Sequence, residues 1–271
     1  MRKEKTKARI GLAQMDILWE DVKHNQKKAE DFFREAKEKD VDLLIFPEMS
    51  LTGFSMNIKK TTANWREQTD FFLEMSRKYE SSVIFGYPAP GKMGEGKPCH
   101  NHLALAQRGV VIMDYIKIHP FSYGQEGDFF QGGEQVVCTA WEDTVLGGFV
   151  CYDLRFPEIF QMSSARSELI AVIANWPESR VDQWDCLLRA RAIENQCYVA
   201  GVNRVGEGGG LFYDGHSALY APDGRQITKK SRREELLIGD CDWEEVRSLR
   251  ETFPVKKDRK EQLYTKMFLS V

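Results

Sequence analysis

The sequence lacks any apolar run approaching the roughly 18–20 residues that a membrane-spanning helix needs. Its first residues, Met1–Lys5, are mostly charged and lead into a predicted strand, so we expect no secretory signal peptide. Both absences argue against a secreted or membrane-embedded chain. The sequence therefore predicts a cytoplasmic protein that has no membrane as a partner.

A large excess of either charge is also missing. The 38 lysines and arginines nearly balance the 41 aspartates and glutamates, which leaves a formal net charge of −3. The basic segment Lys229–Arg233 is short and is followed at once by Glu234 and Glu235, so it indicates a solvated surface. Because nucleic acids and anionic membranes attract strongly basic surfaces, we expect neither as a main partner.

The six cysteines show no disulfide framework, because they are widely spaced and no secretory segment precedes them. The segment Cys99–His102 has metal-binding residue types, but no second pair at a suitable distance completes a tetrahedral site. The glycine-rich segment Gly206–Gly210 lacks the helix and the lysine of a phosphate-binding loop. We therefore expect reduced thiols, no metal and no cofactor, with a flexible loop at 206–210 near the mouth of the functional site.

What the sequence does contain is an alternation of predicted strands and helices, with 42% hydrophobic residues to form a core. No linker or internal repeat divides the chain, so we predict a single domain over residues 1–271. Strands that alternate with helices and hairpins favour an α/β fold of two sheets covered outside by helices. The predicted strands are Arg9–Gln14, Asp42–Pro47, Ser82–Tyr87, Leu103–Ala106, Val110–Ile116, Leu169–Ala174, Tyr198–Val202, Ser217–Tyr220 and Glu235–Gly239. The predicted helices are Asp21–Lys39, Thr69–Tyr79 and Val181–Asn195.

The segment Leu146–Glu158 is the most informative part of the chain. An apolar run with adjacent glycines indicates a buried strand that ends at Cys151, and a helix is predicted to open directly after it with Pro157 in its first turn. A cysteine on such a turn is held out of the sheet, near backbone N–H groups that can receive a developing oxyanion. The segment therefore presents a candidate nucleophile. For this segment alone, a buried structural thiol is the alternative.

Two other strands end in side chains that could activate such a nucleophile. The apolar run Asp42–Pro47 is followed by Glu48, and the strand Val110–Ile116 is followed by Lys117. Open α/β folds place their ligands at the carboxyl ends of strands. A single glutamate or lysine there is usually a solvated residue, but Glu, Lys and Cys at three strand ends together predict one site. No histidine is required.

These segments resemble the nitrilase superfamily of carbon–nitrogen hydrolases, which use a Glu-Lys-Cys triad. The resemblance covers nearly the whole chain and rests on Phe46–Glu48, Lys117–Pro120, Cys151–Glu158, Asn175–Pro177, Arg189–Gln196, Gly201–Gly206, Gly215–Ser217, Pro222–Gly224 and Phe253–Arg259. The Trp-Pro element and the Ala-Ile-Glu-Asn-Gln helix look most like the ω-amidase branch, which hydrolyses the terminal amide of 2-oxo acid ω-amides such as 2-oxoglutaramate. The resemblance implies a four-layer α-β-β-α sandwich, often dimerised through its helical layer.

The chemistry of the three residue types leads to a hypothesis for hydrolysis of a small-molecule amide. Cys151 Sγ would attack the amide carbonyl and form a thioester with loss of ammonia. Glu48 would take the thiol proton, pass it to the leaving nitrogen and then activate the water that cleaves the thioester. The ammonium of Lys117 would face the oxyanion together with the backbone N–H of Tyr152, and it would favour the thiolate form of Cys151.

Further residues are predicted to lie near the substrate. The resemblance implies a second glutamate, Glu126, that positions the lysine or the substrate; without the resemblance it would be a surface loop acid. Trp176 and the loops around Phe121–Phe130 are expected to line the pocket. These residues would decide which substrate enters, while the triad decides the reaction.

Arg155 lies close to the predicted nucleophile along the chain and has two interpretations. Its planar guanidinium suits a substrate carboxylate, which would make the substrate an amide that also carries a carboxylate. It could equally form a structural ion pair with Asp153 or Glu158.

Two alternative functions remain open at the level of the sequence. An N-carbamoyl amino acid hydrolase or a nitrilase would use the same triad with a different pocket. A non-catalytic binding protein on the same fold is disfavoured because Glu48, Lys117 and Cys151 are all present.

Overall fold

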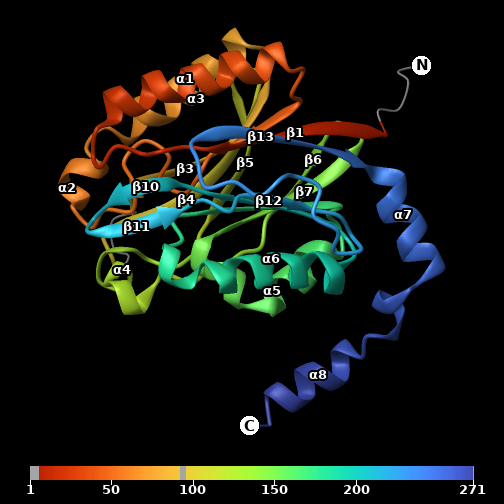
Figure 1. The fold of residues 1–271 in the computed structure, drawn as a ribbon. Helices are drawn as coiled ribbons and strands as arrows, with labels where there is room; N and C mark the ends of the chain where they lie inside the picture. The colour runs from red at the N-terminus through yellow and green to blue at the C-terminus, as the bar shows by residue number, and fades with distance from the viewer. Residues whose placement is uncertain (1–5, 92–95, 271) are drawn as a thin grey trace.

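The computed structural model describes residues 6–91 and 96–270, so the prediction made from Met1–Lys5 lies outside the described residues. Two β-sheets pack face to face, and helices cover the outer face of each sheet (Figure 1). The predicted α/β fold with four layers, α-β-β-α, is confirmed.

The first sheet has the strand order β13-β1-β2-β3-β4-β5. Strands β1, β2 and β3 are parallel, whereas β13, β4 and β5 each run antiparallel to the neighbour through which they join the sheet. Strands β2, β3 and β5 therefore point the same way and end at one edge. The bounds of the six strands are β1 Lys7–Gln14, β2 Leu43–Ile45, β3 Ser82–Pro90, β4 Cys99–Gln107, β5 Val110–Ile116 and β13 Glu235–Asp242.

The second sheet has the order β12-β9-β8-β7-β6, with β7, β8 and β9 parallel in its centre. A short hairpin of β10 and β11 stands beside the two sheets. The bounds are β6 Cys138–Trp141, β7 Thr144–Val150, β8 Leu169–Ala174, β9 Tyr198–Asn203, β10 Val205–Gly208, β11 Leu211–Asp214 and β12 Ala218–Tyr220.

The helices divide between the two outer faces. Helices α1 and α3 lie over the first sheet, and α5 and α6 lie over the second (Figure 1). Helix α1 shows why: it buries Ala29, Phe32, Phe33 and Ala36 at helical spacing, and the Asp21 side chain caps its first turn. The bounds are α1 Val22–Glu38, α2 Ile58–Thr61, α3 Trp65–Lys78, α4 Glu126–Phe129, α5 Pro157–Ser164, α6 Val181–Asn195, α7 Trp243–Thr252 and α8 Glu261–Phe268.

The main core lies between the sheets, where the inward side chains are apolar and fully buried. Leu12, Ile84 and Leu103 from the first sheet belong to the same buried cluster as Phe149 and Val172 from the second. Because both sheets are covered on each face, their central strands are almost continuously apolar, as the sequence indicated.

The predicted loop at Gly206–Gly210 is wrong in part, because most of it belongs to the β10–β11 hairpin. Gly209 and Gly210 form its turn with φ values of 60° and 75°, which glycine adopts without strain. Glycine richness had suggested a loop because glycine is rare in strands. Leu211 and Tyr213, which follow this segment on β11, line the candidate site, whereas none of residues 206–210 does.

The helix expected directly after Cys151 begins later than predicted. A 3₁₀ turn, Cys151–Arg155, comes first, and α5 then starts with Pro157 at its first position. Helices α7 and α8 near the C-terminus were not predicted from the sequence, and the side chains of α8 are not buried.

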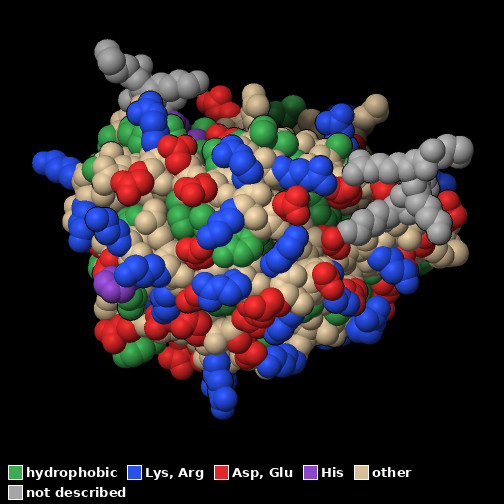
Figure 2. All heavy atoms as spheres, turned by 90° about the horizontal axis from the view of Figure 1, so that it is seen from above, with side chains coloured by type: hydrophobic (Ala, Val, Ile, Leu, Met, Phe, Trp, Pro, Cys, Tyr) green, Lys and Arg blue, Asp and Glu red, His purple; other side chains and the backbone are tan. Residues whose placement is uncertain are grey.

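The face above α1 and α3 carries basic and acidic side chains that are intermixed (Figure 2). Neighbouring opposite charges also form surface pairs there, such as Lys78 with Glu30 at 2.6 Å. This face therefore presents no patch of one sign. Within 6–91 and 96–270, no helix combines the length and apolar character needed to cross a membrane.

Candidate active site

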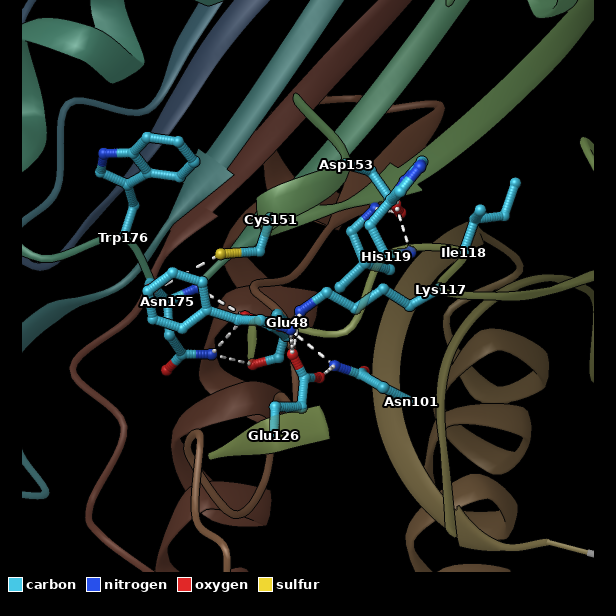
Figure 3. Close-up of polar contacts among 12 residues, drawn as sticks. Glu48, Asn101, Lys117, Ile118, His119, Glu126, Cys151, Asp153, Asn175 and Trp176 are labelled. Carbon is cyan, nitrogen blue, oxygen red and sulfur yellow. Dashed lines mark hydrogen bonds and ion pairs between the residues drawn. The ribbon is translucent and has the colours of Figure 1, made fainter. Parts of the chain in front are cut away.

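The predicted triad converges at the edge where strands of both sheets end (Figure 3). Glu48 follows β2, Lys117 directly follows β5, and Cys151 directly follows β7. The charges of Lys117 and Glu48 act electrostatically on the thiol of Cys151. The structure thus brings together the three side chains that the sequence placed at separate strand ends.

Lys117 lies between two carboxylates. Its side chain is 1% exposed, and Nζ is 3.0 Å from Glu48 Oε1 and 2.7 Å from Glu126 Oε2. Burial alone would lower the pKa of the ammonium, but attraction to Glu126 and Glu48 outweighs it and raises the pKa. Lys117 therefore stays positively charged at every pH near neutrality.

Glu48 is fully buried, and both oxygens of its carboxylate accept hydrogen bonds. Oε1 accepts from Lys117 and from Asn101, and Oε2 accepts from the backbone N–H of Asn175 at 3.0 Å. The amide of Asn175 also donates to the Glu48 backbone carbonyl at 2.7 Å. These bonds fix the direction of the carboxylate without a second cation.

A close approach of two backbones holds the Glu48 turn in place. Gly86 on β3 faces this turn, and a Cβ at this position would lie 2.6 Å from the nitrogen of Met49 and 2.9 Å from the Cα of Glu48. Ser50 Oγ donates to the carbonyl of Pro47 and accepts from the N–H of Gly86, which ties the turn to β3. Only glycine fits between the strand and the turn.

Glu126 lies where the resemblance placed a second glutamate, in α4. It is fully buried, and Oε2 accepts from the N–H of Phe121 at 2.5 Å besides Lys117. Burial raises the pKa of this carboxyl, the charge of Lys117 opposes the rise, and the charge of Glu48 adds to it. The alternative of a surface loop acid is therefore wrong.

Cys151 occupies the sharp turn that the sequence predicted. Its φ of 48° is in the left-handed region, and its thiol points to the carbonyl of Asn175 at 3.9 Å. Burial, with the charge of Glu48 second, raises the pKa of the thiol well above its usual value, and Lys117 only partly offsets this. Lys117 does favour the thiolate, as expected, but burial and the charge of Glu48 outweigh it, so this thiol is harder to ionise than a free one and benefits from a nearby base.

Asp153 joins the cysteine turn to the lysine strand. Its buried carboxylate accepts from the N–H of Val150 at 3.1 Å and from the backbone N–H and Nδ1 of His119 at 3.0 and 2.8 Å. The hydroxyl of Tyr115 on β5 donates to it at 2.8 Å. The ring of His119 stacks on Phe156 with centroids 3.6 Å apart. These contacts fix Cys151 and Lys117 relative to each other across the two sheets.

A narrow pocket of about 40 Å³ opens on Cys151, and aromatic rings and arginines line it. All three residues predicted to contact substrate besides Glu126 line it: Tyr152, Arg155 and Trp176. The remaining lining residues are Phe54, Phe121, Asn175, Pro177, Arg180, Leu211 and Tyr213.

Arg155 does not form the structural ion pair that the sequence left open. Within the described part of the chain its guanidinium pairs with no carboxylate, and Nη2 donates instead to the neutral amide of Gln183 at 2.6 Å. The guanidinium carbon lies 4.8 Å from the ring centroid of Trp176 and 6.0 Å from that of Tyr152. The Arg155 guanidinium is therefore positioned by two aromatic rings, and it can still pair with an anion that enters the pocket.

Trp176 is placed by a buried polar network rather than by apolar packing alone. Its backbone N–H donates to Asn203 Oδ1 at 2.7 Å, and its indole N–H donates to the carbonyl of Arg180 at 2.7 Å. Asn203 is at the end of β9, so the third parallel strand of the second sheet also contributes to the site.

Several residues of the site were missed by the sequence interpretation. Asn101 lies in a segment that had been considered only for metal binding, and Arg180 and Tyr213 lie in connections whose position depends on tertiary packing. The alternation of β4 could have placed Asn101 at the sheet edge, but nothing local indicated its partners. Among the described residues, no group of three or more histidine, cysteine, aspartate or glutamate side chains is arranged to hold a metal ion.

Comparison with known proteins agrees with this geometry. The family model described as "Carbon-nitrogen hydrolase" matches residues 9–251. The chain belongs to the carbon–nitrogen hydrolase family. It is therefore an enzyme that cleaves a carbon–nitrogen bond.

Two curated relatives cover almost the entire chain. The 2-oxoglutaramate amidase of Bacillus subtilis (strain 168) is 31% identical over 94% of this chain and 98% of its own length. The omega-amidase YafV of Escherichia coli (strain K12) is 32% identical over 93% of this chain and 97% of its own length.

Solved structures of the family superpose closely. A CN-hydrolase superfamily protein from Xanthomonas campestris, solved with an arsenic adduct in its active site, has a TM-score of 0.85 and 27% identity over 94% of this chain and 97% of its own. A variant of the amidase from Nesterenkonia sp. AN1 has a TM-score of 0.84 and 25% identity over 96% of both chains. In that amidase, the acetamide moiety of fluoroacetamide is covalently attached to the active-site cysteine.

Proposed function

We propose that this hydrolase is an ω-amidase: it removes ammonia from the terminal amide of small 2-oxo acid ω-amides, such as 2-oxoglutaramate. The observation that carries the proposal is the combination of one buried Glu-Lys-Cys cluster with a pocket whose two arginines lack carboxylate partners among the described residues. The first feature suits amide cleavage, and the second suits a substrate with a carboxylate at its other end.

In the acylation half of the reaction, Glu48 takes the proton of the Cys151 thiol as Sγ attacks the carbonyl carbon of the amide. The resulting oxyanion is stabilised by the ammonium of Lys117 and the backbone N–H of Tyr152. Glu48 then gives the proton to the nitrogen, the carbon–nitrogen bond breaks, and ammonia leaves a thioester on Cys151. The raised pKa of the thiol supports this role of Glu48, because a thiol that stays protonated needs a base beside it.

In the second half, Glu48 takes a proton from a water molecule that attacks the thioester carbonyl. The same two donors face the second oxyanion. When this intermediate collapses, the carbon–sulfur bond breaks, the sulfur recovers the proton from Glu48, and the acid product leaves. Glu126 keeps Lys117 in position throughout, which its bond to Nζ of 2.7 Å supports.

The pocket supports a small, anionic substrate. Arg155 and Arg180 lie on its wall, and the guanidinium of Arg180 faces the ring of Phe121 at 5.6 Å instead of an acid. A planar guanidinium binds a carboxylate through two parallel hydrogen bonds. We assign the substrate carboxylate to these two arginines, with the rings of Tyr152 and Trp176 holding the aliphatic part.

The test is ammonia release from 2-oxoglutaramate, compared with N-carbamoyl amino acids and simple nitriles. The proposal predicts that kcat/KM is highest for the ω-amide. Faster turnover of a carbamoyl amino acid or a nitrile would move the protein to another branch of the family. No ammonia release from any of the three classes would favour the non-catalytic binding protein.

We also propose that the protein is a cytoplasmic homodimer that associates through its second helical layer. The outer faces of α5, α6 and α8 expose Met162 at 63%, Ile193 at 47% and Met267 at 58%. Helix α8 extends past α5 and α6 (Figure 1), and the segment before it is tied to α5 by Arg259 Nη1, 2.7 Å from Gln161 Oε1. The apolar side chains that α5, α6 and α8 expose suit association with a second copy of the chain.

Sedimentation equilibrium measures this association. We expect a dimer for the wild type and a monomer for a Met162→Asp, Met267→Asp double variant. A matched pair of changes on the opposite helical layer, Lys27→Asp and Arg34→Asp, should leave the dimer intact. A wild-type monomer at micromolar concentration would contradict the proposal.

A further inference from the structure

One buried residue is hydrogen-bonded to all three charged residues of the lysine cluster, through its side chain to the two glutamates and through its backbone to the lysine. Asn101 on β4 is 1% exposed, and its Nδ2 donates to Glu48 Oε1 at 2.8 Å and to Glu126 Oε1 at 2.9 Å. Its backbone carbonyl accepts from the N–H of Lys117 at 2.9 Å. Figure 3 shows the side chain reaching toward both glutamates, on the opposite side from Cys151.

The Asn101 amide completes a ring of hydrogen bonds in which one donor, Lys117, is charged and the other, Asn101, is neutral. Lys117 Nζ joins the two carboxylates on one side, and Asn101 Nδ2 joins them on the other. Two adjacent carboxylates disfavour each other's ionised form, and a single lysine does not neutralise both. The neutral N–H donors of Asn101 stabilise both carboxylates in addition to Lys117 and bring no further charge into the cluster.

The orientation of the amide supports a task beyond packing. Oδ1 of Asn101 is buried and has no hydrogen-bond partner among the described residues. The reversed orientation would aim Oδ1 at two carboxylates, so acceptors would face acceptors. The unpaired Oδ1 is unfavourable, so the amide is oriented to give both of its N–H groups to the glutamates.

We propose that Asn101 is a positioning residue of this hydrolase, whose Nδ2 group keeps Glu48 ionised and directed while Lys117 stays paired with both glutamates. The inference rests on the proposed role of Glu48 as the base for Cys151. Asn101 touches neither the substrate nor the reacting atoms, and it acts only through Glu48 and Glu126.

The variant Asn101→Asp tests this role because it keeps the shape and removes the two N–H donors. The ionisable groups beside this position are Glu48 after β2, Lys117 after β5 and Glu126 in α4, and their charges in turn act on Cys151 after β7. A third carboxylate among them favours protonation of the acids. The acidic limb of kcat/KM against pH should therefore move up by about one pH unit or more, and kcat at pH 7 should fall about 10²-fold.

Asn195→Asp is the matched control. Asn195 at the end of α6 is also fully buried, and its Nδ2 donates to the carbonyl of Arg191 at 2.9 Å, away from the site. If Asn101 were merely structural, both variants would lose thermal stability and neither would move the acidic limb. If Asn101→Asp does not fold, Asn101→Ser serves instead, because its short hydroxyl donates to at most one glutamate.

A second readout separates this inference from the proposed function. The rate at which iodoacetamide alkylates Cys151, followed by peptide mass against pH with the exposed Cys186 as reference thiol, needs no amide substrate. We expect the Cys151 profile of the Asn101 variant to move to higher pH and that of Asn195→Asp to match the wild type. A protein that is alkylated in this way but hydrolyses no amide would contradict the proposed function alone. Unchanged profiles in folded Asn101→Asp would overturn the positioning role.

Discussion

The buried cluster and the pocket wall treat positive charge in opposite ways. In the cluster, Lys117 lies within 3.0 Å of two carboxylates, and its neighbours use nearly all their hydrogen-bonding capacity. On the wall, Arg155 and Arg180 face aromatic rings, and within the described part of the chain no acid pairs with either. The cluster is thus complete without a ligand, whereas the wall has unneutralised charge.

This difference separates the reaction from the choice of substrate. A cluster whose charges are already paired is preorganised, so in the proposed mechanism it would stabilise a developing oxyanion without rearranging. Arginines without acid partners gain most when an anionic substrate arrives. Changes in the cluster should therefore affect every substrate equally, and changes on the wall should affect only anionic ones.

The largest effect should follow from Lys117→Met. The change removes the oxyanion donor and leaves two buried carboxylates unpaired, so turnover should fall by at least about 10³-fold. The free energy of unfolding should fall by about 3–5 kcal/mol, as when one partner of a buried pair is lost. Ammonia release and urea denaturation measure the two effects. Lys78→Met is the control because it removes only an exposed ion pair with Glu30. Equal losses of turnover and stability in the two variants would show that the buried cluster is not special.

Arg155→Gln should reduce activity on substrates that carry a carboxylate and spare neutral ones. For an ω-amide with a carboxylate, kcat/KM should fall about 10²-fold, since a hydrogen bond between charged groups contributes about 1.5–3 kcal/mol. For a neutral amide of the same length, kcat/KM should change little. Arg180→Gln should act in the same direction with a smaller effect. An equal loss on both substrates would mean that Arg155 supports the fold of the site and not carboxylate binding.

Gly86→Ala should couple stability to activity in the cluster. The added methyl lies 2.6 Å from the nitrogen of Met49, so the turn that bears Glu48 must shift. We expect a loss of about 1–3 kcal/mol in the free energy of unfolding, as for overpacked cores, together with lower kcat for all substrates. Gly96→Ala is the control because its nearest atom would be 3.6 Å away. A destabilised variant with unchanged kcat would show that the Glu48 turn tolerates displacement.

The smallest predicted effect is on the pH dependence of stability and concerns Lys256. This amine is half-buried like an interior group, but it lacks the two paired carboxylates that surround Lys117. Burial, with repulsion from Arg250 second, lowers its pKa to about 8, and Nζ donates to Ser164 Oγ. Between pH 8 and the ordinary lysine value the unfolded chain binds more protons, so wild-type stability gains a small increment as pH rises. Thermal unfolding of the wild type and Lys256→Met at pH 7 and pH 10 measures it. If the wild type instead lost stability relative to the variant as pH rises, the prediction would be wrong.

Sequence alone located the three proposed catalytic residues because each follows a predicted strand. Glu48, Lys117 and Cys151 could be found in this way, since strand ends are local features and parallel strands share an edge. The partners of these residues could not, because Asn101 reaches the cluster through the register of β4. Arg180 joins the pocket only through tertiary packing of a loop. The raised pKa of the Cys151 thiol was likewise hidden, because burial is its main cause and no local sequence pattern reports burial at a turn.

The most direct test of the account is the rate of ammonia release from 2-oxoglutaramate by Glu48→Gln, with Cys151→Ala and the double variant measured alongside. If a thiol that is protonated at rest depends on this base, Glu48→Gln should lose turnover by a factor of about 10²–10⁴. The double variant should be no slower than Cys151→Ala, because residues that act as one unit are not additive. Wild-type turnover in folded Glu48→Gln would contradict the account.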